Sequence, residues 1–264
     1  MECGMRWAGV LLMLVAAGNV LAETAGPVAM PEVVVTALRS ETALASVPGT
    51  VRVLDRAEVR QAAPRTTPDA LAGLPSVMVQ KTGYGQGSPF LRGFTGFRTL
   101  MMVDGIRLNN SVFRDGPNQY WNTVDPWSVD RYEVVLGPAS VLYGSDAVGG
   151  AVNALTLAPP DWSGQPFYER ALAWRGATAD ESTQARLGLR GRATERLGFT
   201  AGFTWKDFND LRGGEEVGTQ RKTGYDEIDF DLRADYALNE QNVLTLVHQQ
   251  VDQDDAWRTH KTIY

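Results

Sequence analysis

Residues 129–144, VDRYEVVLGPASVLYG, and residues 146–153, DAVGGAVN, carry the clearest signals of the fold. Two strands are predicted within this stretch, at residues 131–135 and 151–155, because turn-forming residues bound both runs. A Gly-Pro turn at Gly137 follows the first strand, and a pair of glycines precedes the second. Short strands joined by tight turns indicate a compact domain built around a sheet rather than a helical bundle.

Two short helices are predicted upstream of this stretch. Asp55 is followed three residues later by Glu58, which is the pattern of a capping box at a helix N-terminus. A second helix is expected with Thr67 as its N-cap and Pro68 in its first turn, and a glycine and a proline end it soon afterwards.

Four further strands are predicted between the helices and this stretch, at residues 77–80, 89–92, 99–103 and 106–109. Asp104 and Gly105 join the last two, and this residue pair is typical of a type I′ turn because both central positions need a positive φ. The sequence therefore predicts a β-hairpin there. Residues 41–158 together predict one compact α+β domain.

Beyond residue 158 the pattern changes to longer segments in which apolar and polar residues alternate. The alternation is clear at residues 183–191, 197–206 and 228–236 and weaker at 168–175 and 242–251. Strands of about ten residues with one apolar and one charged face are typical of transmembrane β-strands, with lipid outside and water inside. The alternative is a soluble β-sandwich whose polar face is exposed to water.

The composition narrows the class of protein. The 264 residues are 44% hydrophobic and 21% charged, which is enough apolar material for a core and excludes a wholly disordered chain. The formal net charge of -6 has the wrong sign for a protein that binds phosphate backbones, so we expect no nucleic-acid partner.

The N-terminus predicts export. Arg6 precedes an unbroken apolar run at residues 10–17, and small residues lead to a cleavage site between Ala22 and Glu23, as in a secretory signal peptide. The run is shorter than the ~20 residues that span a membrane, which disfavours the alternative of an anchor. Cys3 is the single cysteine, so neither a disulfide framework nor a cysteine-based metal site is expected.

A β-branched segment follows the leader and consists of Glu32, Val33, Val34, Val35, Thr36 and Ala37. By composition it is either the first strand of the domain or an extended peptide that adds itself to the sheet edge of a partner protein.

Four motifs resemble the plug domain of TonB-dependent outer-membrane receptors: LRGF at residues 91–94, MVDGIR at 102–107, and the two runs at 129–144 and 146–153. The resemblance covers about residues 32–155. It implies an α+β plug domain followed by antiparallel strands of an incomplete transmembrane β-barrel. The expected division is a signal peptide at 1–22, a flexible leader with the TonB box at 23–40, the plug at 41–158 and the first barrel strands at 159–264.

The resemblance also implies a function, which is import of a scarce and bulky nutrient across the outer membrane of a Gram-negative cell after export through the Sec route. Its expected partners are the TonB energy-transducing complex, outer-membrane lipid, and an iron-siderophore or haem as cargo, with no cofactor of its own. Cobalamin or an oligosaccharide is a further possible cargo. The alternative is a non-transporting periplasmic module that uses the plug fold for binding or adhesion.

The resemblance assigns roles to residues of this sequence. The six residues from Glu32 to Ala37 match the TonB box. Contacts between plug and barrel are expected for Arg92, Arg131 and Glu133. Ligand contacts are expected for residues of two plug loops, Tyr84, Gln86, Phe113, Arg114, Tyr120 and Trp121; the alternative is that these aromatic side chains pack against the barrel wall. The family usually has an arginine where this chain has Leu136, which puts one plug-to-barrel contact in doubt.

The length of the chain departs from the family. Plugged transporters close about 22 strands, whereas residues 160–264 provide about five strands at roughly 20 residues per strand and connection. Open strand edges would leave backbone groups unsatisfied in lipid. We therefore expect the sequence to be a fragment.

Catalytic motifs are missing from the sequence. The two histidines, His248 and His260, do not form an H-E-x-x-H motif, and no G-x-S-x-G or Walker motif occurs. The sequence therefore predicts that the chain is not an enzyme.

Overall fold

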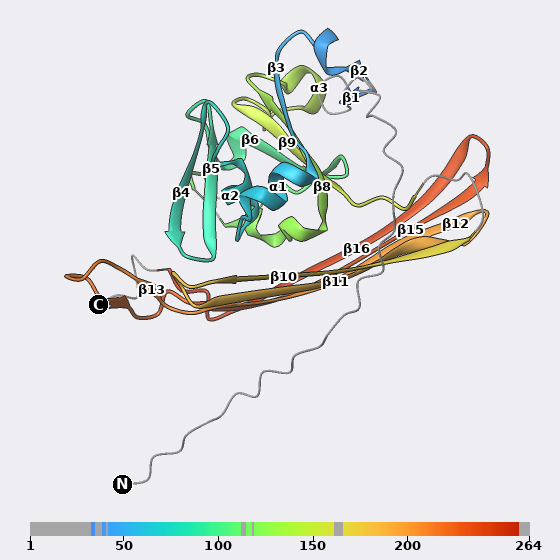
Figure 1. Ribbon diagram of the computed structural model, residues 1–264. Coiled ribbons are helices and arrows are strands. Elements are labelled where there is room, and N and C mark those ends of the chain that lie inside the picture. The colour runs from blue at the N-terminus through green and yellow to red at the C-terminus, as the bar shows by residue number, and fades with distance from the viewer. Residues whose placement is uncertain are drawn as a thin grey trace. The chain divides into compact units, whose positions relative to one another are not determined.

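The computed structural model describes residues 33–34, 39–40, 42–111, 115–117, 119–160 and 166–258 (Figure 1). The predicted signal peptide and most of the leader lie outside the described residues. Residues from Glu32 onward form one compact unit. It has two parts, which we call the α+β domain (residues 42–157) and the long sheet (residues 167–254).

The α+β domain is built on a five-stranded sheet with the order β3-β8-β9-β6-β7. Its strands are β3 (Thr50–Leu54), β6 (Thr99–Val103), β7 (Ile106–Arg107), β8 (Val129–Leu136) and β9 (Gly150–Thr156). β6 and β9 pair in parallel and the other neighbours pair antiparallel. The two strands predicted within residues 129–153 are β8 and β9. They are neighbours in this sheet, and β9 is its central strand.

A second, two-stranded sheet projects from the domain as a hairpin, β4 (Val77–Gly83) and β5 (Gln86–Leu91). The short β1 (Val33–Val34) pairs with β2 (Thr42–Ala43). Helical turns fill the connections, namely α1 (Arg56–Ala62), α2 (Thr67–Leu71), α3 (Ser140–Tyr143) and the 3-10 turns η1 (Leu44–Ser46), η2 (Gly96–Arg98), η3 (Tyr120–Thr123) and η4 (Pro126–Ser128). None of the described helices is long and apolar enough to cross a membrane.

The first predicted helix is confirmed, together with its cap. Asp55 accepts a hydrogen bond from the Glu58 backbone N–H at 2.8 Å, and the Glu58 carboxylate accepts one from the Asp55 N–H at 2.9 Å. The N-cap predicted for the second helix is wrong by one residue. Thr66 is the N-cap, because its hydroxyl and backbone N–H both donate to Asp69. The hydroxyl of Thr67 instead donates to the Val124 carbonyl at 2.8 Å.

The hairpin predicted at Asp104 and Gly105 is confirmed. Both residues have positive φ, 49° and 79°, and Val103 pairs with Ile106 across the turn. The Asp104 carboxylate also accepts hydrogen bonds from the Thr156 N–H at 2.8 Å and hydroxyl at 2.6 Å. The turn is therefore held both by its own φ preference and by β9.

The core of the α+β domain lies between its sheet and the helices. Leu71, Leu91, Tyr132, Val134 and Val152 are among its buried members. Leu136, which stands where the family usually has arginine, belongs to the same cluster. An apolar side chain at this position is therefore used for packing inside the domain.

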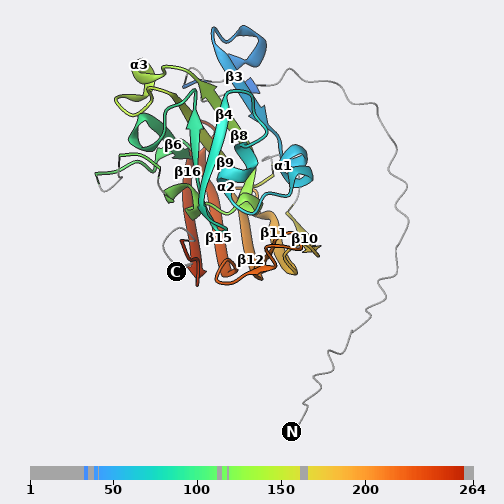
Figure 2. The same ribbon diagram turned by 90° about the vertical axis from the view of Figure 1, so that its left-hand side faces the viewer.

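The long sheet is an antiparallel meander with the order β10-β11-β12-β15-β16 (Figure 2). Its strands are β10 (Phe167–Ala177), β11 (Ser182–Thr194), β12 (Leu197–Phe208), β15 (Tyr225–Asn239) and β16 (Asn242–Asp254). The connection between β12 and β15 carries a small hairpin, β13 (Leu211–Arg212) and β14 (Thr219–Gln220). All five predicted strands are present, and each is longer than the alternating segment from which it was predicted.

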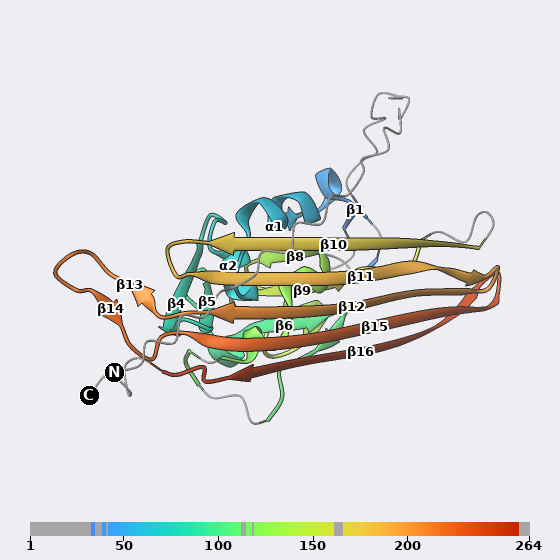
Figure 3. The same ribbon diagram turned by 60° about the horizontal axis from the view of Figure 1, so that its bottom comes forward.

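The two faces of the long sheet have opposite polarity, and the α+β domain lies against the polar one (Figures 1 and 3). One row in direct register, Leu172, Leu187, Phe203 and Phe230, is exposed on the outer face, with Leu172 76% exposed. Buried side chains of the inner face are mostly polar: Gln184, Arg186, Thr200, Thr204, Lys206, Glu227, Asp229 and Asp231. A β-sandwich has the reverse arrangement, so that alternative is wrong. The apolar outer face is typical of strands in lipid.

Candidate functional site between the domain and the long sheet

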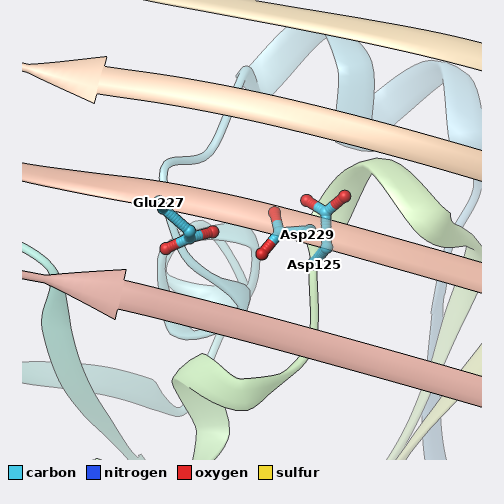
Figure 4. Close-up of side chains that lie close together, drawn as sticks. All are labelled: Asp125, Glu227 and Asp229. Carbon is cyan, nitrogen blue, oxygen red and sulfur yellow. The ribbon is translucent and has the colours of Figure 1, made fainter.

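Asp125 is the residue of the α+β domain whose carboxylate pairs with buried cations on the polar face of the long sheet. It is the N-cap of η4, where its carboxylate accepts a hydrogen bond from the Trp127 backbone N–H at 3.1 Å. Pro126 fixes the first position of that turn. The carboxylate is thereby held against strands β12 and β15, and Figure 4 shows it facing Glu227 and Asp229.

The ammonium group of Lys206 lies among three carboxylates. Its Nζ is 2.8 Å from Asp125 Oδ1, 2.8 Å from Asp229 Oδ2 and in direct contact with Glu227. The strand register explains the arrangement, since Lys206 pairs directly with Glu227 across β12 and β15. Lys206 is fully buried, so these ion pairs are shielded from water and salt.

Arg186 forms a second ion pair beside the first. Its guanidinium lies 3.2 Å from Asp125 Oδ2 and 2.7 Å from Asp231 Oδ1, and it donates to the Thr204 hydroxyl at 2.8 Å. Thr204 in turn donates to Asp125 Oδ2 at 2.7 Å. Gly202 makes this possible, because a Cβ there would overlap the Arg186 guanidinium and the Asp231 carboxylate. We call Asp125, Arg186, Thr204, Lys206, Glu227, Asp229 and Asp231 the ionic cluster.

The electrostatics of Asp125 follow from its two cations. Burial alone favours the neutral carboxyl, but Lys206 and Arg186 outweigh it and hold the pKa of Asp125 below its usual value. Asp125, Glu227 and Asp229 are close enough together to suit a metal ion by geometry. However, the Lys206 ammonium already occupies the position between them and would repel a second cation. The cluster is therefore an ionic contact between the domain and the sheet.

A second contact lies at the tip of the β4–β5 hairpin. The Tyr84 hydroxyl donates to Asp180 in the β10–β11 turn, and the Tyr84 ring packs edge-on against Phe208 and Tyr225, with centroids 5.8 and 6.2 Å away. Gly85 allows the close approach, because a Cβ there would lie 3.0 Å from the Tyr225 ring. Burial and the bond to Asp180 raise the pKa of Tyr84, so its hydroxyl stays a donor at neutral pH.

The same tip is bonded to the segment that follows β16. The Gln86 amide donates to the Ala256 carbonyl at 3.0 Å and accepts from Arg258 at 3.3 Å. Arg258 also donates to Gln119 at 2.7 Å. We call Tyr84, Gln86, Asp180, Phe208, Tyr225 and Arg258 the hairpin-tip contact.

The structure separates the residues for which ligand contacts were predicted. Tyr84 and Gln86 lie together in the hairpin-tip contact. Trp121 is 2% exposed in the core of the α+β domain, and Tyr120 is half-buried at the start of η3. Phe113 and Arg114 lie outside the described residues. For Tyr84, the position is the one expected from the alternative of packing against the barrel wall.

Arg92, Arg131 and Glu133, for which plug-to-barrel contacts were predicted, have neighbours within the α+β domain. Arg131 pairs with Glu133 at 3.0 Å, and Arg92 donates to the Thr50 hydroxyl at 3.1 Å. Their contacts with a barrel remain a prediction. The contact that the structure does form, between Asp125 and Lys206, was missed. The one signal for it in the sequence is a charged residue on the polar face of each alternating segment, such as Lys206 and Asp229.

Of the predicted TonB box, Val33 and Val34 are described and pair in antiparallel register with Ala43 and Thr42. Glu32, Val35, Thr36 and Ala37 lie outside the described residues. The segment is thus extended at Val33 and Val34. An extended conformation is expected both for a first strand of the domain and for a peptide that adds itself to the sheet edge of a partner.

An α+β domain bound to the polar face of an antiparallel sheet, with the other face apolar and exposed, is the arrangement of a plug against the wall of a membrane protein (Figure 1). Comparison with known families agrees with this interpretation. The model of the family "TonB-dependent Receptor Plug Domain" matches residues 43–151. Residues 43–151 are therefore a plug domain of this family, and the antiparallel strands that follow it also resemble those of TonB-dependent receptors.

Curated relatives extend the similarity beyond the plug. The chain is 30% identical over 220 residues to the vitamin B12 transporter BtuB of Vibrio vulnificus strain CMCP6, which covers 82% of this chain and 32% of that protein. It is 33% identical over 156 residues to an iron-regulated outer membrane virulence protein of Vibrio cholerae serotype O1, covering 57% and 24%. The chain thus spans a third or less of the length of these relatives.

Solved structures show the same fold. The ferric enterobactin receptor PfeA matches with a TM-score of 0.59 and 21% identity, over 78% of this chain and 33% of that one. The pyoverdine outer membrane receptor FpvA of Pseudomonas aeruginosa PAO1 matches with a TM-score of 0.66 and 16% identity, over 84% and 30%. Because the similar proteins are transporters and receptors, the prediction that the chain is not an enzyme is confirmed.

Proposed function

We propose that this chain is the plug and the first wall strands of a transporter that imports a scarce, bulky nutrient across the outer membrane of a Gram-negative cell. The observation that carries the proposal is the reversed polarity of the long sheet. Its apolar face is exposed, and its charged face is bound to the α+β domain through Asp125, Lys206 and Arg186. Lipid outside and a blocked polar lumen inside account for both faces.

The division of the chain follows the same proposal. Residues 1–22 are a signal peptide for the Sec route, 23–40 a flexible leader, 41–158 the plug and 159–264 the first barrel strands. Support comes from the apolar run at residues 10–17 and from the α+β domain and strands described above.

The energy for transport is proposed to arrive through the segment from Glu32 to Ala37, as a TonB box that the TonB complex binds. Three consecutive valines favour an extended strand, and an extended strand can be captured by an exposed sheet edge. The pairing of Val33 and Val34 with β2 supports a strand conformation for this segment.

The proposed cargo is an iron-siderophore or haem. Among the similar proteins, one is named an iron-regulated virulence protein and others are ferric enterobactin and pyoverdine receptors, whereas several are vitamin B12 transporters. The proposed ligand contacts remain those of the two plug loops. Because Tyr84 and Trp121 are buried, direct contact by these two residues requires the loops to move first.

Uptake in cells that carry the complete gene tests the transport proposal. Val34→Pro removes a backbone donor from the box, so uptake that depends on the proton-motive force is expected to fall to the level of cells treated with a protonophore. Ala25→Pro, in the leader before the box, is the matched control and leaves uptake unchanged. Wild-type uptake rates in the Val34→Pro strain would contradict the box assignment.

The cargo is tested in the same cells by supplying labelled ferric chelates, haem and cobalamin in parallel. Uptake of a ferric chelate or haem that excess cobalamin does not reduce is the expected result. The alternative function, a periplasmic binding or adhesion module, predicts that residues 23–264 are soluble without detergent. The exposed apolar row on the long sheet argues against that outcome.

A further inference from the structure

A cavity of about 280 Å³ lies between α1 and the long sheet and adjoins the ionic cluster, of which Arg186 and Asp231 form part of the cavity wall. Helix α1 runs along the β10 side of that sheet (Figures 1 and 3), and its C-cap is fixed there by Arg175, which donates to the Ala63 carbonyl at 2.7 Å. The wall on the sheet side is made by small residues of three strands, Ala171, Gly188 and Ala201, which leave the cavity open.

The cavity is lined by arginines on both sides. Arg56 and Arg60 come from α1, and Arg186 and Arg190 come from β11. The two strand arginines have partners, since Arg186 pairs with Asp231 and Arg190 with Glu169 at 2.6 Å. Among the described residues, the side chains of Arg56 and Arg60 donate no hydrogen bond and form no ion pair. Positive charge therefore exceeds negative charge around the cavity.

The placement of Arg56, which is half-buried, beside Arg60, which is exposed, has an electrostatic cost. They are four residues apart on one helix, and like charges at this spacing destabilise a helix. Burial lowers the pKa of Arg56, as does the charge of neighbouring Arg60, with Arg190 and Arg186 adding to the effect and Asp130 opposing it. A bound anion would remove this repulsion and give both guanidinium groups the two-oxygen partner that they bind best.

The residues around the two arginines also indicate what kind of group would be attached to a bound anion. Trp127 lines the cavity between the two α1 arginines and the sheet, and a smaller apolar hollow formed by Val59, Pro64 and Pro126 adjoins it. An apolar group attached to the anionic head would have a surface to pack against.

We propose that this cavity binds an organic carboxylate, with its oxygens on Arg56 and Arg60 and its apolar body against Trp127. The inference rests on the proposed function in one respect, which is that the bound carboxylate is taken to be the imported cargo. That cargo would then pass between the domain and the sheet as an anion. The binding itself follows from the cavity and its charges.

Calorimetric titration of the full chain in detergent with benzoate tests the site, and the neutral isostere benzamide and inorganic phosphate serve as comparison probes. Benzoate is expected to bind, and to bind at least tenfold more tightly than either comparison probe. Arg56→Gln with Arg60→Gln is expected to weaken benzoate binding at least tenfold. Arg52→Gln, an exposed arginine on β3 away from the cavity, is the matched control and leaves binding unchanged.

Thermal unfolding without ligand shows that the double variant still folds. Its midpoint is expected to equal or exceed that of the wild type, because a repulsion has been removed. Absence of benzoate binding by the wild type, equal binding of benzamide or phosphate, or full binding by the double variant would each overturn the site. These results are independent of uptake, so absence of energy-dependent uptake by cells that carry the complete gene would refute transport without affecting the binding measurement.

Discussion

Two of the contacts between the α+β domain and the long sheet, the ionic cluster and the hairpin-tip contact, rely on different forces. In the ionic cluster, Asp125 meets Lys206 and Arg186 in a region closed to water. At the hairpin tip, Tyr84 packs on Phe208 and Tyr225 and its hydroxyl bonds to Asp180, which also pairs with Arg65 at 3.4 Å. The first contact stabilises through charges that are costly to separate, and the second through apolar area. A change in charge and a change in side-chain volume should therefore loosen the domain at different ends.

Removing the central cation should have the largest effect. Lys206→Met leaves Asp125, Glu227 and Asp229 buried without their shared partner, and the free energy of unfolding is expected to fall by about 3–5 kcal/mol. Denaturant titration in detergent measures it. Arg212→Met breaks the exposed pair with Glu181 and is the control, with an expected change of less than about 1 kcal/mol. Equal losses in the two variants would refute the ionic cluster as a principal attachment.

Truncating the aromatic side chain at the hairpin tip should rank second. Tyr84→Ala removes the ring from Phe208 and Tyr225 and is expected to cost about 2–4 kcal/mol. The loss should be local, so amide hydrogen exchange should quicken in β4 and β5 more than in β8 and β9. Tyr84→Phe keeps the ring, loses the bond to Asp180 and should cost about 1 kcal/mol. Uniform quickening of exchange would show that the two attachments are not separate.

Adding one carbon beside the ionic cluster should have a smaller effect. The new Cβ in Gly202→Ala displaces Arg186 and Asp231, at an expected cost of about 1–3 kcal/mol. Gly188 pairs directly with Gly202 and offers a matched control, because its Cβ would meet the Ala171 Cβ at an ordinary 3.5 Å. If Gly188→Ala proved as costly in denaturant titration, backbone freedom rather than the ion pair would be the reason for glycine.

Lowering the pH should have the smallest effect on stability, and it should weaken the ionic cluster but not the packing at the hairpin tip. Because the pKa of Asp125 is lowered in the folded state, its contribution is complete above the ordinary value of 3.8 and is lost as pH falls through the lower folded value. The stability difference between wild type and Asp125→Asn, measured by denaturant titration, should be smaller at pH 2 than at pH 5. A difference that does not shrink over this range would contradict the lowered pKa.

The sequence predicted what depends on neighbours along the chain. The Asp104–Gly105 turn and the Asp55–Glu58 cap are each decided within four residues, and both are present. The N-cap of α2 was misplaced because Thr66 and Thr67 are equally suitable in isolation, and Val124, far along the chain, engages the hydroxyl of Thr67. The alternating segments gave the strands and their two faces.

The attachment of the domain could not be predicted in this way. Asp125 and Thr204 are 79 residues apart, and their hydrogen bond depends on how η4 lies on the sheet. The parallel pairing of β6 with β9 depends similarly on the strands between them. The family resemblance predicted ligand contacts for Tyr84 and Gln86 in a glycine-rich plug loop, but Gly85 of the same loop also permits close packing on Tyr225. Sequence alone does not distinguish these two uses.

The alternation of the long sheet has a consequence for how such chains are found. Any hydropathy profile that averages consecutive residues combines Ile228 and Phe230 with Asp229 and Asp231 and yields a value near zero. The mean hydropathy of the whole chain is -0.21, which resembles that of an ordinary water-soluble enzyme. A genome search for proteins of this kind therefore has to score odd and even positions separately. The difference in hydropathy between the two sets of positions, rather than their average, indicates that one face of the strand meets lipid and the other does not.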